Sequence, residues 1–343
     1  YIGTHLVNHA CGLASLETLN SGREIFVSVW RSWPGTILLY DSLLTHISLF
    51  FIGLYLRRTF RLKPREYFQI FSGLAIPFLL VEHILGTRGL NAAFQVNDNY
   101  LYEILVLWVY APEKGVLQMI LIAIVWSHGC IGIHFWLRLK PHYNRFSSFA
   151  LILAIITPLM ALGGFISSGQ EIEILRKNSL WLENTNQSIN WPSDIAVAWV
   201  SDWKIIFWKV FGGLMIFTIT ANFVRWLKNY HSHQIYLTYS DNLVVKIKSG
   251  ITVLEASKLK NIQHANLCGG KGRCATCLIQ LGRGLENVEA PSSLERKSLK
   301  RINAPKNARL ACQLKPTHDL EVRLLLSPNC KPRDLHKSIY IPE

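Results

Sequence analysis

Long apolar runs separated by short polar stretches fill the first two thirds of the chain. A helix needs about 20 apolar residues to cross the hydrocarbon core of a bilayer. Six runs reach or approach this length, the first of them cut short by the start of the sequence. They lie at 1–16, 35–56, 67–85, 116–137, 146–167 and 203–227. The pattern predicts an all-α domain over residues 1–233, a bundle of six transmembrane helices.

The pattern changes near residue 234, where short β-branched runs, glycine turns and many lysines replace the apolar blocks. A hairpin, further strands and two short helices are expected, the second helix capped by Ser292 or Ser293 and carrying Glu295 in its first turn. The expected strands are 235–239, 243–248, 278–281 and 320–325, the first expected helix is 253–259, and the second runs to Arg301. This order predicts a small α+β domain over residues 234–343.

Composition agrees with this division. Half of the residues are hydrophobic and 17% are charged, whereas soluble domains usually carry about 25% charged residues. The net charge is +14, and residues 234–343 hold 18 Lys and Arg against 9 Asp and Glu. A basic domain beside membrane spans is typical of contact with anionic lipid headgroups. We therefore expect membrane lipid, and no nucleic acid, as a partner.

Lysine and arginine are distributed unequally between the two sets of connections. One set holds ten of them in 21 positions, at 57–65, 138–145 and 225–228. The other set holds seven in 84 positions, at 17–33, 86–115 and 168–204. Because positively charged loops face the cytoplasm, the first set and the C-terminal domain are expected to be cytoplasmic. The expected location is the bacterial inner membrane.

The strongest chemical signal is a group of four cysteines, Cys268, Cys274, Cys277 and Cys312, at the spacing C-x5-C-x2-C-x34-C. Four thiolates can hold a [2Fe–2S] cluster, and the glycines after Cys268 permit the tight turns of a loop around it. Structural zinc is the alternative, but zinc sites usually pair two C-x2–4-C units. Disulfides are disfavoured in the cytoplasm. A [2Fe–2S] cluster is therefore the expected cofactor, and Cys330 an ordinary thiol.

Six histidines fall within the apolar runs: His5, His9, His46, His83, His128 and His134. Ionisable groups inside a membrane are costly and tend to mark function, and imidazole is a haem ligand. Several spans with one histidine each favour bis-histidine haem. The haem is expected to be b-type, because the chain has no C-x2-C-H attachment motif. Two haems are expected, with one haem or none as the alternative.

Depth along the helices selects the first pair, at about 1.5 Å per residue. His46 precedes the basic Arg57 by 11 residues, and His128 precedes Arg138 by 10. Both therefore lie about 15 Å above the inner side, and they are the expected ligands of an inner haem. His134 follows His128 by six residues, on another face of the helix, and is expected near the interface.

The second pair is expected near the outer side. His83 lies 18 residues beyond the basic Arg65, which places it about 27 Å above the inner side. Its expected partner is His9, with His5 as the alternative because it lies one turn away on the same helix face. Small residues beside His9 and His128 are expected to leave room for a flat macrocycle.

Two acidic residues, Asp41 and Glu82, lie in the outer halves of their runs. Each either hydrogen-bonds a neighbouring helix or moves protons at a quinone site, because buried acids in a membrane need a partner or a function. The sequence leaves both interpretations open.

The C-terminal domain resembles the β-grasp ferredoxins. The five-residue gap between the first two cysteines and the segment Arg309-Leu-Ala-Cys312-Gln are similar to the adrenodoxin-like branch rather than the plant branch. The resemblance implies a ferredoxin-like fold around the cluster. Shuttle ferredoxins are acidic, whereas this domain is basic, so a fixed position beside the membrane is expected instead of free diffusion.

Span count and histidine placement resemble the diheme cytochrome b anchors of the succinate dehydrogenase and fumarate reductase type. Joined to a ferredoxin-like domain, they resemble the N-terminal half of bacterial membrane-anchored class III adenylate cyclases. The resemblance implies a quinone-responsive haem anchor. It implies cyclase activity only for a longer parent protein, because we identify no cyclase region and no catalytic residue in this chain.

The leading hypothesis is a redox sensor that carries electrons between quinone, b-type haems and the [2Fe–2S] cluster, and regulates an attached or associated cyclase domain. The alternatives are a quinone oxidoreductase that exchanges electrons with a soluble partner, and an accessory subunit of a respiratory complex. A homodimer is the expected assembly.

Overall fold

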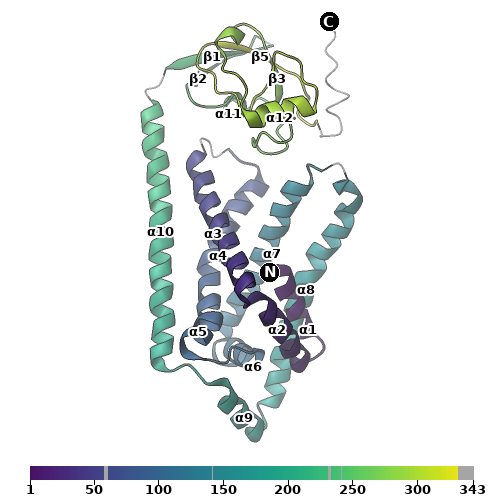
Figure 1. The fold of residues 1–343 in the computed structure, drawn as a ribbon, viewed down its shortest axis with the longest axis vertical. Coiled ribbons are helices and arrows are strands. Elements are labelled where there is room, and N and C mark those ends of the chain that lie inside the picture. Colours follow the sequence, from purple (N-terminus) through teal and green to yellow (C-terminus); the bar gives the residue numbers. More distant parts are fainter. Residues whose placement is uncertain (58–60, 141, 231–232, 241, 331–343) are drawn as a thin grey trace. The chain divides into compact units, whose positions relative to one another are not determined.

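The computed structural model describes residues 1–57, 61–140, 142–230, 233–240 and 242–330 (Figure 1). The chain divides into two compact units. The helical unit contains Tyr1–Ile52, Pro64–Gly132 and Phe146–Phe217, and the sheet unit contains Gly53–Lys63, Ile133–Arg145 and Thr218–Glu343. The predicted domain boundary falls between the end of helix α10 at Tyr230 and the start of strand β1 at Gln234, where residues 231 and 232 lie outside the described part.

Five helical segments of the described chain are long and apolar enough to cross a membrane. They are α3 (Trp33–Leu56), α7 (Pro112–Leu137), α8 (Tyr143–Leu175), α10 (Asp194–Tyr230) and the segment Pro64–Phe94, in which α4 (Pro64–Ile84) continues through the π-helical η1 (Leu85–Gly89) into α5 (Leu90–Phe94). Five of the six predicted spans are thereby confirmed, each as a longer helix than predicted. The chain is a multi-pass membrane protein.

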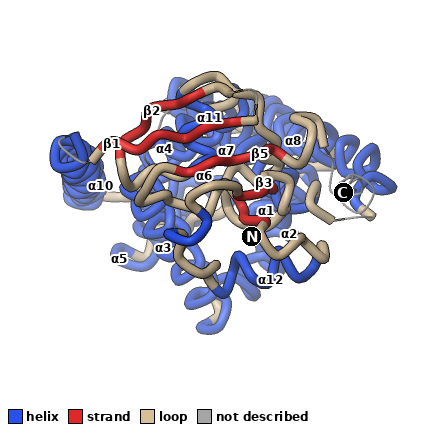
Figure 2. The backbone as a smooth tube through the Cα atoms, turned by 90° about the horizontal axis from the view of Figure 1, so that it is seen from above, coloured by secondary structure: helices blue, strands red, loops and turns tan. Residues whose placement is uncertain are grey.

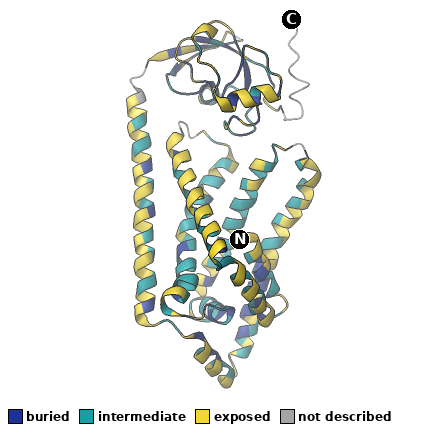
Figure 3. Cartoon of the chain, in the orientation of Figure 1, coloured by how far each residue is buried: buried dark blue, intermediate teal, exposed yellow. Residues whose placement is uncertain are grey.

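The surfaces of these helices fit a hydrocarbon solvent. Figure 3 shows exposed residues along most of α10, and they include Ile216 and Phe217, which are 69% and 71% exposed. Extended apolar surface is rare on soluble monomers, because water drives it into contact with a partner or a membrane. Lipid tails remove that driving force.

The predicted run at 1–16, which the start of the sequence cuts short, is not among the candidate spans of the described chain. Helix α1 (Ile2–Cys11) has 10 residues, a length of about 15 Å, and a turn then leads into α2 (Leu16–Trp30). The Ser15 hydroxyl accepts the Thr18 N–H at 3.0 Å and starts this new helix. At Gly12, a Cβ would lie 2.6 Å from the Gly164 carbonyl oxygen of α8, so glycine is needed there for close helix packing.

The connections predicted at 17–33, 86–115 and 168–204 are largely helical. Besides α2 they contain α6 (Tyr100–Ile104), the π-helical η2 (Leu105–Tyr110) and α9 (Ser179–Ile189). These elements pack around a second hydrophobic core, whose fully buried members include Leu19, Ile104, Leu105, Ile172 and Ile189. Their apolar residues are too few for a membrane span, but they suffice to close one end of the helical unit.

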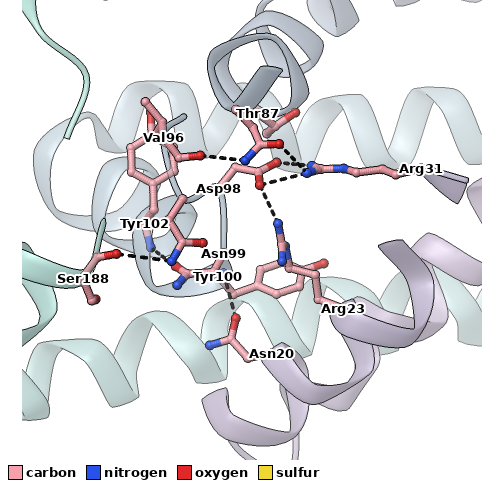
Figure 4. A network of polar contacts seen from close by, with 12 residues as sticks. Asn20, Arg23, Arg31, Thr87, Val96, Asp98, Asn99, Tyr100, Tyr102 and Ser188 are labelled. Atoms are coloured by element: carbon pink, nitrogen blue, oxygen red, sulfur yellow. Dashed lines mark hydrogen bonds and ion pairs between the residues drawn. The ribbon is translucent and has the colours of Figure 1, made fainter. Parts of the chain in front are cut away.

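A buried carboxylate joins α2 to the segment before α6. Asp98 accepts hydrogen bonds from Arg23 at 2.5 Å and from both terminal nitrogens of Arg31 (Figure 4). Its side chain is 2% exposed. Nearby, the Asn20 side-chain oxygen accepts the Tyr100 N–H at 2.9 Å. A buried ion must be paired and hydrogen-bonded to be tolerated, and two guanidinium groups satisfy Asp98.

The sheet unit contains a mixed five-stranded sheet in the order β2-β1-β5-β3-β4. Its strands are β1 (Gln234–Tyr239), β2 (Val244–Lys248), β3 (Leu278–Leu281), β4 (Ala308–Leu310) and β5 (Leu320–Leu324). The pair β1–β5 is parallel and the other pairs are antiparallel. Figure 2 shows the strands in red. The predicted hairpin and the strands at 278–281 and 320–325 are confirmed, and β4 was not predicted.

Two helices complete this domain, α11 (Val253–Leu259) and α12 (Ser293–Arg301), and both confirm predictions. Helix α11 begins at a capping box in which the Thr252 hydroxyl accepts the Glu255 N–H and the Glu255 carboxylate accepts the Thr252 N–H. The domain core contains the inward side chains of the strands, among them Leu237, Ile279 and Val322. This ferredoxin-like fold holds the cysteine loop between α11 and β3.

Candidate metal centres

The loop between α11 and β3 turns sharply around three of the four cysteines. Gly269, Gly270 and Gly272 have φ angles of 71°, 92° and 67°, which is the left-handed region that glycine enters without steric cost. Ala275 also has a positive φ, 59°, although its side chain disfavours that region. The sequence identified the glycines but gave no sign of the alanine.

The four cysteines are buried and form two pairs. The Cys274 thiol hydrogen-bonds the Cys268 sulfur and lowers the pKa of Cys268 to about 5, and this contact together with burial raises the pKa of Cys274. In the same way, the Cys277 thiol lowers the pKa of Cys312, and the pKa of Cys277 is raised. Each pair therefore places two sulfur atoms side by side.

Two pairs are the arrangement that two iron ions need. A [2Fe–2S] cluster takes four cysteine thiolates, two for each iron. A structural zinc ion instead takes four ligands around one centre. In the described part of the chain, no three His, Cys, Asp or Glu side chains gather closely enough to hold a single ion. The two cysteine pairs supply the four thiolates that a [2Fe–2S] cluster would take.

Two polar side chains contact the cysteine sulfurs. The Thr276 hydroxyl lies 3.0 Å from the Cys274 sulfur and accepts the Leu267 N–H at 3.0 Å, so its own proton is available to the sulfur. The Gln313 amide nitrogen lies 3.4 Å from the Cys312 sulfur. Hydrogen bonds to the sulfurs help to set the reduction potential of such clusters. Sequence reasoning missed Thr276.

The start of the loop is fixed by a buried polar chain. The Ser257 hydroxyl donates to the Val253 carbonyl oxygen at 3.0 Å and lies 2.9 Å from the Tyr239 hydroxyl and 3.0 Å from Nδ1 of His264. Burial lowers the pKa of His264 to about 4, so this histidine is neutral. It joins the loop to α11 and β1 without a buried charge.

The last ligand, Cys312, follows strand β4, which a buried ion pair holds against α12. Glu295 accepts from Nε and Nη2 of Arg309, both at 2.9 Å, and from the Leu310 N–H at 2.8 Å. The Arg309 Nη1 donates to the Glu289 carbonyl oxygen at 2.6 Å. Such bidentate pairs fix orientation as well as distance. The sequence suggested Glu295 only as a first-turn acid.

We predict that Glu295→Ala destabilises the ferredoxin-like domain by about 3–5 kcal/mol, because it leaves the Arg309 guanidinium buried without its carboxylate. Thermal unfolding followed by the visible absorbance of the cluster measures the change. The control is Glu321→Ala, which removes an ion pair with Arg283 whose side chains are 95% and 43% exposed and which should cost less than about 1 kcal/mol. Equal losses in both variants would contradict the prediction.

The helical unit brings the predicted histidines together in pairs. The ring centres of His46 in α3 and His128 in α7 lie 6.0 Å apart, with the rings at 87°. The ring centres of His5 in α1 and His83 in α4 also lie 6.0 Å apart. The ring centre of His9 lies 4.8 Å from that of His5, and the His9 ring also packs against Tyr100. The 6.0 Å spacing to His83 thus belongs to His5, which was the alternative partner.

This spacing can be compared with that of metal-bound imidazoles. An imidazole nitrogen lies about 2.0–2.1 Å from its metal and the ring centre roughly 1 Å beyond, so two rings on opposite sides of one ion have centres about 6 Å apart. Both pairs therefore have the ring-centre spacing that bis-histidine ligation of one iron ion would need. At Gly129, beside His128, a Cβ would meet no atom within 4 Å; at Gly12, by contrast, the small side chain serves helix packing.

Two further polar residues of the spans, His134 and Glu82, have structural partners. Nδ1 of His134 lies 3.1 Å from the Tyr143 hydroxyl, at the end of α7. Glu82 forms ion pairs with Lys114 at 2.8 Å and Lys204 at 3.3 Å, which come from neighbouring helices. This agrees with the structural interpretation of Glu82. Asp41 is exposed on α3.

Residues 240–317 match the family model of the 2Fe-2S iron-sulfur cluster binding domain. Over 112 residues the chain is 27% identical to a component of the Na(+)-translocating NADH-quinone reductase of Chlamydia muridarum. The aligned segment covers 33% of this chain and 25% of that protein. Over 46 residues it is 46% identical to the chloroplastic photosynthetic NDH subunit of subcomplex B 3 of Arabidopsis thaliana. This segment covers 13% of this chain and 22% of that protein. The chain thus spans about a quarter of these relatives.

Among solved structures, the chain is similar to an ISC-like [2Fe–2S] ferredoxin from Pseudomonas putida JCM 20004, with 25% identity over 26% of this chain and 89% of that one, at a TM-score of 0.24. Reduced putidaredoxin from Pseudomonas putida matches with 22% identity over 27% and 95%, at a TM-score of 0.24. The family match includes all four cysteines. A [2Fe–2S] ferredoxin domain, which transfers electrons, therefore follows the membrane helices.

Proposed function

We propose that the chain is a membrane-bound electron-transfer module in which two b-type haems and a [2Fe–2S] cluster carry electrons to or from quinone. One observation carries the proposal. Two histidine pairs with 6.0 Å spacing lie in the helical unit of a chain that also has a ferredoxin domain. Ionisable side chains inside membrane segments are costly and persist where they serve function.

The haem ligands in this proposal are His46 with His128, and His83 with His5. A bound haem supplies reversible one-electron exchange at its iron. The protein would contribute the imidazole ligands and the apolar surroundings that exclude water. His9, the partner of His83 predicted from the sequence, is the competing ligand, and variants of His5 and His9 separate the two.

A short connection joins the last membrane helix to the ferredoxin domain. Helix α10 ends at Tyr230 and β1 starts at Gln234. A connection this short gives the domain a high effective concentration at the membrane. The excess of 18 basic over 9 acidic residues in 234–343 favours anionic headgroups. We propose that this side is the cytoplasmic face of a bacterial inner membrane.

The proposed function extends to regulation. A longer parent protein would carry an adenylate cyclase domain and act as a homodimer. The redox state of the cluster would control that domain. This part rests on the resemblance in spans, histidines and cysteine spacing. The second candidate is an oxidoreductase or an accessory subunit of a respiratory complex. The names of the curated relatives favour it, because the Chlamydia protein is part of an NADH-quinone reductase.

The test is addition of a quinol to the oxidised full chain in lipid vesicles. Oxidation of one quinol releases two electrons and two protons, and we expect haem absorbance to change before cluster absorbance. The variant His46→Ala should slow cluster reduction at least tenfold, whereas His142→Ala, at an exposed histidine, should not. Cluster reduction at the wild-type rate in His46→Ala would contradict this electron path and favour a soluble electron donor.

A further inference from the structure

The ring of His128 is contacted by three neighbouring positions on one face of helix α4. Nδ1 of His128 lies 2.9 Å from the Ser72 hydroxyl, and Nε2 lies 3.2 Å from the Gln69 amide nitrogen. A Cβ at Gly73 would lie 3.1 Å from Cε1 of His128. Helix α4 therefore packs its backbone and two polar side chains directly against this ring.

The hydroxyl proton of Ser72 is committed elsewhere. The Ser72 hydroxyl donates to the Phe68 carbonyl oxygen at 2.6 Å, and a hydroxyl has one proton but two lone pairs. Toward His128 it can therefore act only as an acceptor. The contact at 2.9 Å requires a proton on Nδ1 of His128, and a neutral ring with that proton leaves the lone pair on Nε2.

The contact at Nε2 agrees with this assignment. The Gln69 amide nitrogen donates to the His128 carbonyl oxygen at 3.0 Å, which fixes the orientation of the amide, because its oxygen in that position would face another acceptor. The second N–H of the same group lies 3.2 Å from Nε2, where a donor meets a lone pair. Both ring nitrogens thus specify the same tautomer.

We propose that Ser72 is a positioning residue for His128: it holds the ring in the tautomer that presents the Nε2 lone pair to iron. The inference rests on the proposed function. A metal-bound histidine usually donates its other N–H to a fixed acceptor, and loss of that acceptor costs about 10- to 100-fold in metal affinity. Ser72, buried in α4, is such an acceptor.

Ser72 and Gln69 make opposite contributions in this arrangement. The Ser72 contact is at Nδ1 and would persist if Nε2 bound iron. The Gln69 contact uses the Nε2 lone pair itself and would have to give way. In the outer pair, Nδ1 of His5 is buried with no hydrogen-bond partner. The effect of Ser72 should therefore be confined to one haem, and the other haem serves as an internal reference.

The experiment compares Ser72→Ala, Ser72→Thr and Gln69→Met in the full chain, with haem titration and low-temperature EPR of the ferric haems. In Ser72→Ala we expect the haem that His46→Ala removes to bind about 10- to 100-fold more weakly and its low-spin signal to shift. Threonine, which keeps the hydroxyl, should restore both. Gln69→Met should not weaken haem binding, and the second haem should stay unchanged in every variant.

Unchanged affinity and an unchanged signal in Ser72→Ala, with two haems bound to the wild type, would overturn this inference alone. A wild-type chain without low-spin haem would contradict the proposed function as well. An equal change of both haem signals in Ser72→Ala would also overturn the inference, because it would indicate general disruption of the helical unit.

Discussion

Replacement of any one of Cys268, Cys274, Cys277 and Cys312 by serine is expected to abolish the [2Fe–2S] signal of the reduced protein. The sulfur atoms form two buried pairs, and each iron depends on both members of its pair. Loss of one thiolate leaves an iron without its full ligand set and opens a buried site to water. EPR of the reduced protein and assay of acid-labile sulfide measure the loss.

The matched control is Cys330→Ser. Cys330 is buried in the core of the same domain, so it tests whether removal of any buried thiol has the same effect. We expect its cluster signal to remain. A tetrahedral zinc centre seen by X-ray absorption, without iron, would contradict the cluster assignment, and so would equal loss of signal in Cys330→Ser.

His46→Ala and His128→Ala are each expected to remove the same haem, which halves the haem content. Their ring centres lie 6.0 Å apart, and a bis-histidine haem that loses one ligand loses its low-spin state. His83→Ala and His5→Ala are expected to remove the other haem, because the same spacing joins this pair. Optical spectra and haem extraction measure both changes.

Two histidines serve as controls for this series. His134 lies on the same helix as His128 but contacts Tyr143. Both haems should therefore remain in the variant His134→Ala. His9→Ala should also keep both if His5 is the ligand; loss of the second haem in His9→Ala with retention in His5→Ala would restore the partner chosen from the sequence. Full haem content in all variants would show that the histidines are structural.

The sequence predicted the elements that depend on a long apolar run or on residues close together in the chain. The spans are visible because a bilayer requires a continuous apolar length. Helix α11 is visible because Thr252 and Glu255 form a capping box within four residues. The cysteine loop is visible because the spacing of its three cysteines and its glycines all occur in one short segment. Depth counting along helices also placed His46 and His128 at the same level.

What the sequence did not show depends on residues far apart in the chain. The sequence does not predict helix α2, because its stabilising contacts, such as Arg23 with Asp98, join positions 75 residues apart. The choice between His5 and His9 depends on how α1 packs on α4. Because the two histidines lie one helical turn apart on the same face, the sequence pattern does not distinguish them. The acceptor for His128, Ser72, lies 56 residues away and carries no motif.

Spin quantification of both kinds of centre in one preparation of the intact chain tests whether haems and cluster occur together in this protein. EPR of the oxidised protein should show low-spin ferric haem at two per chain, and EPR of the reduced protein should show one [2Fe–2S] cluster per chain. A cluster signal with no low-spin haem would contradict the proposed electron path, and the helices would then be a membrane anchor for the ferredoxin domain alone.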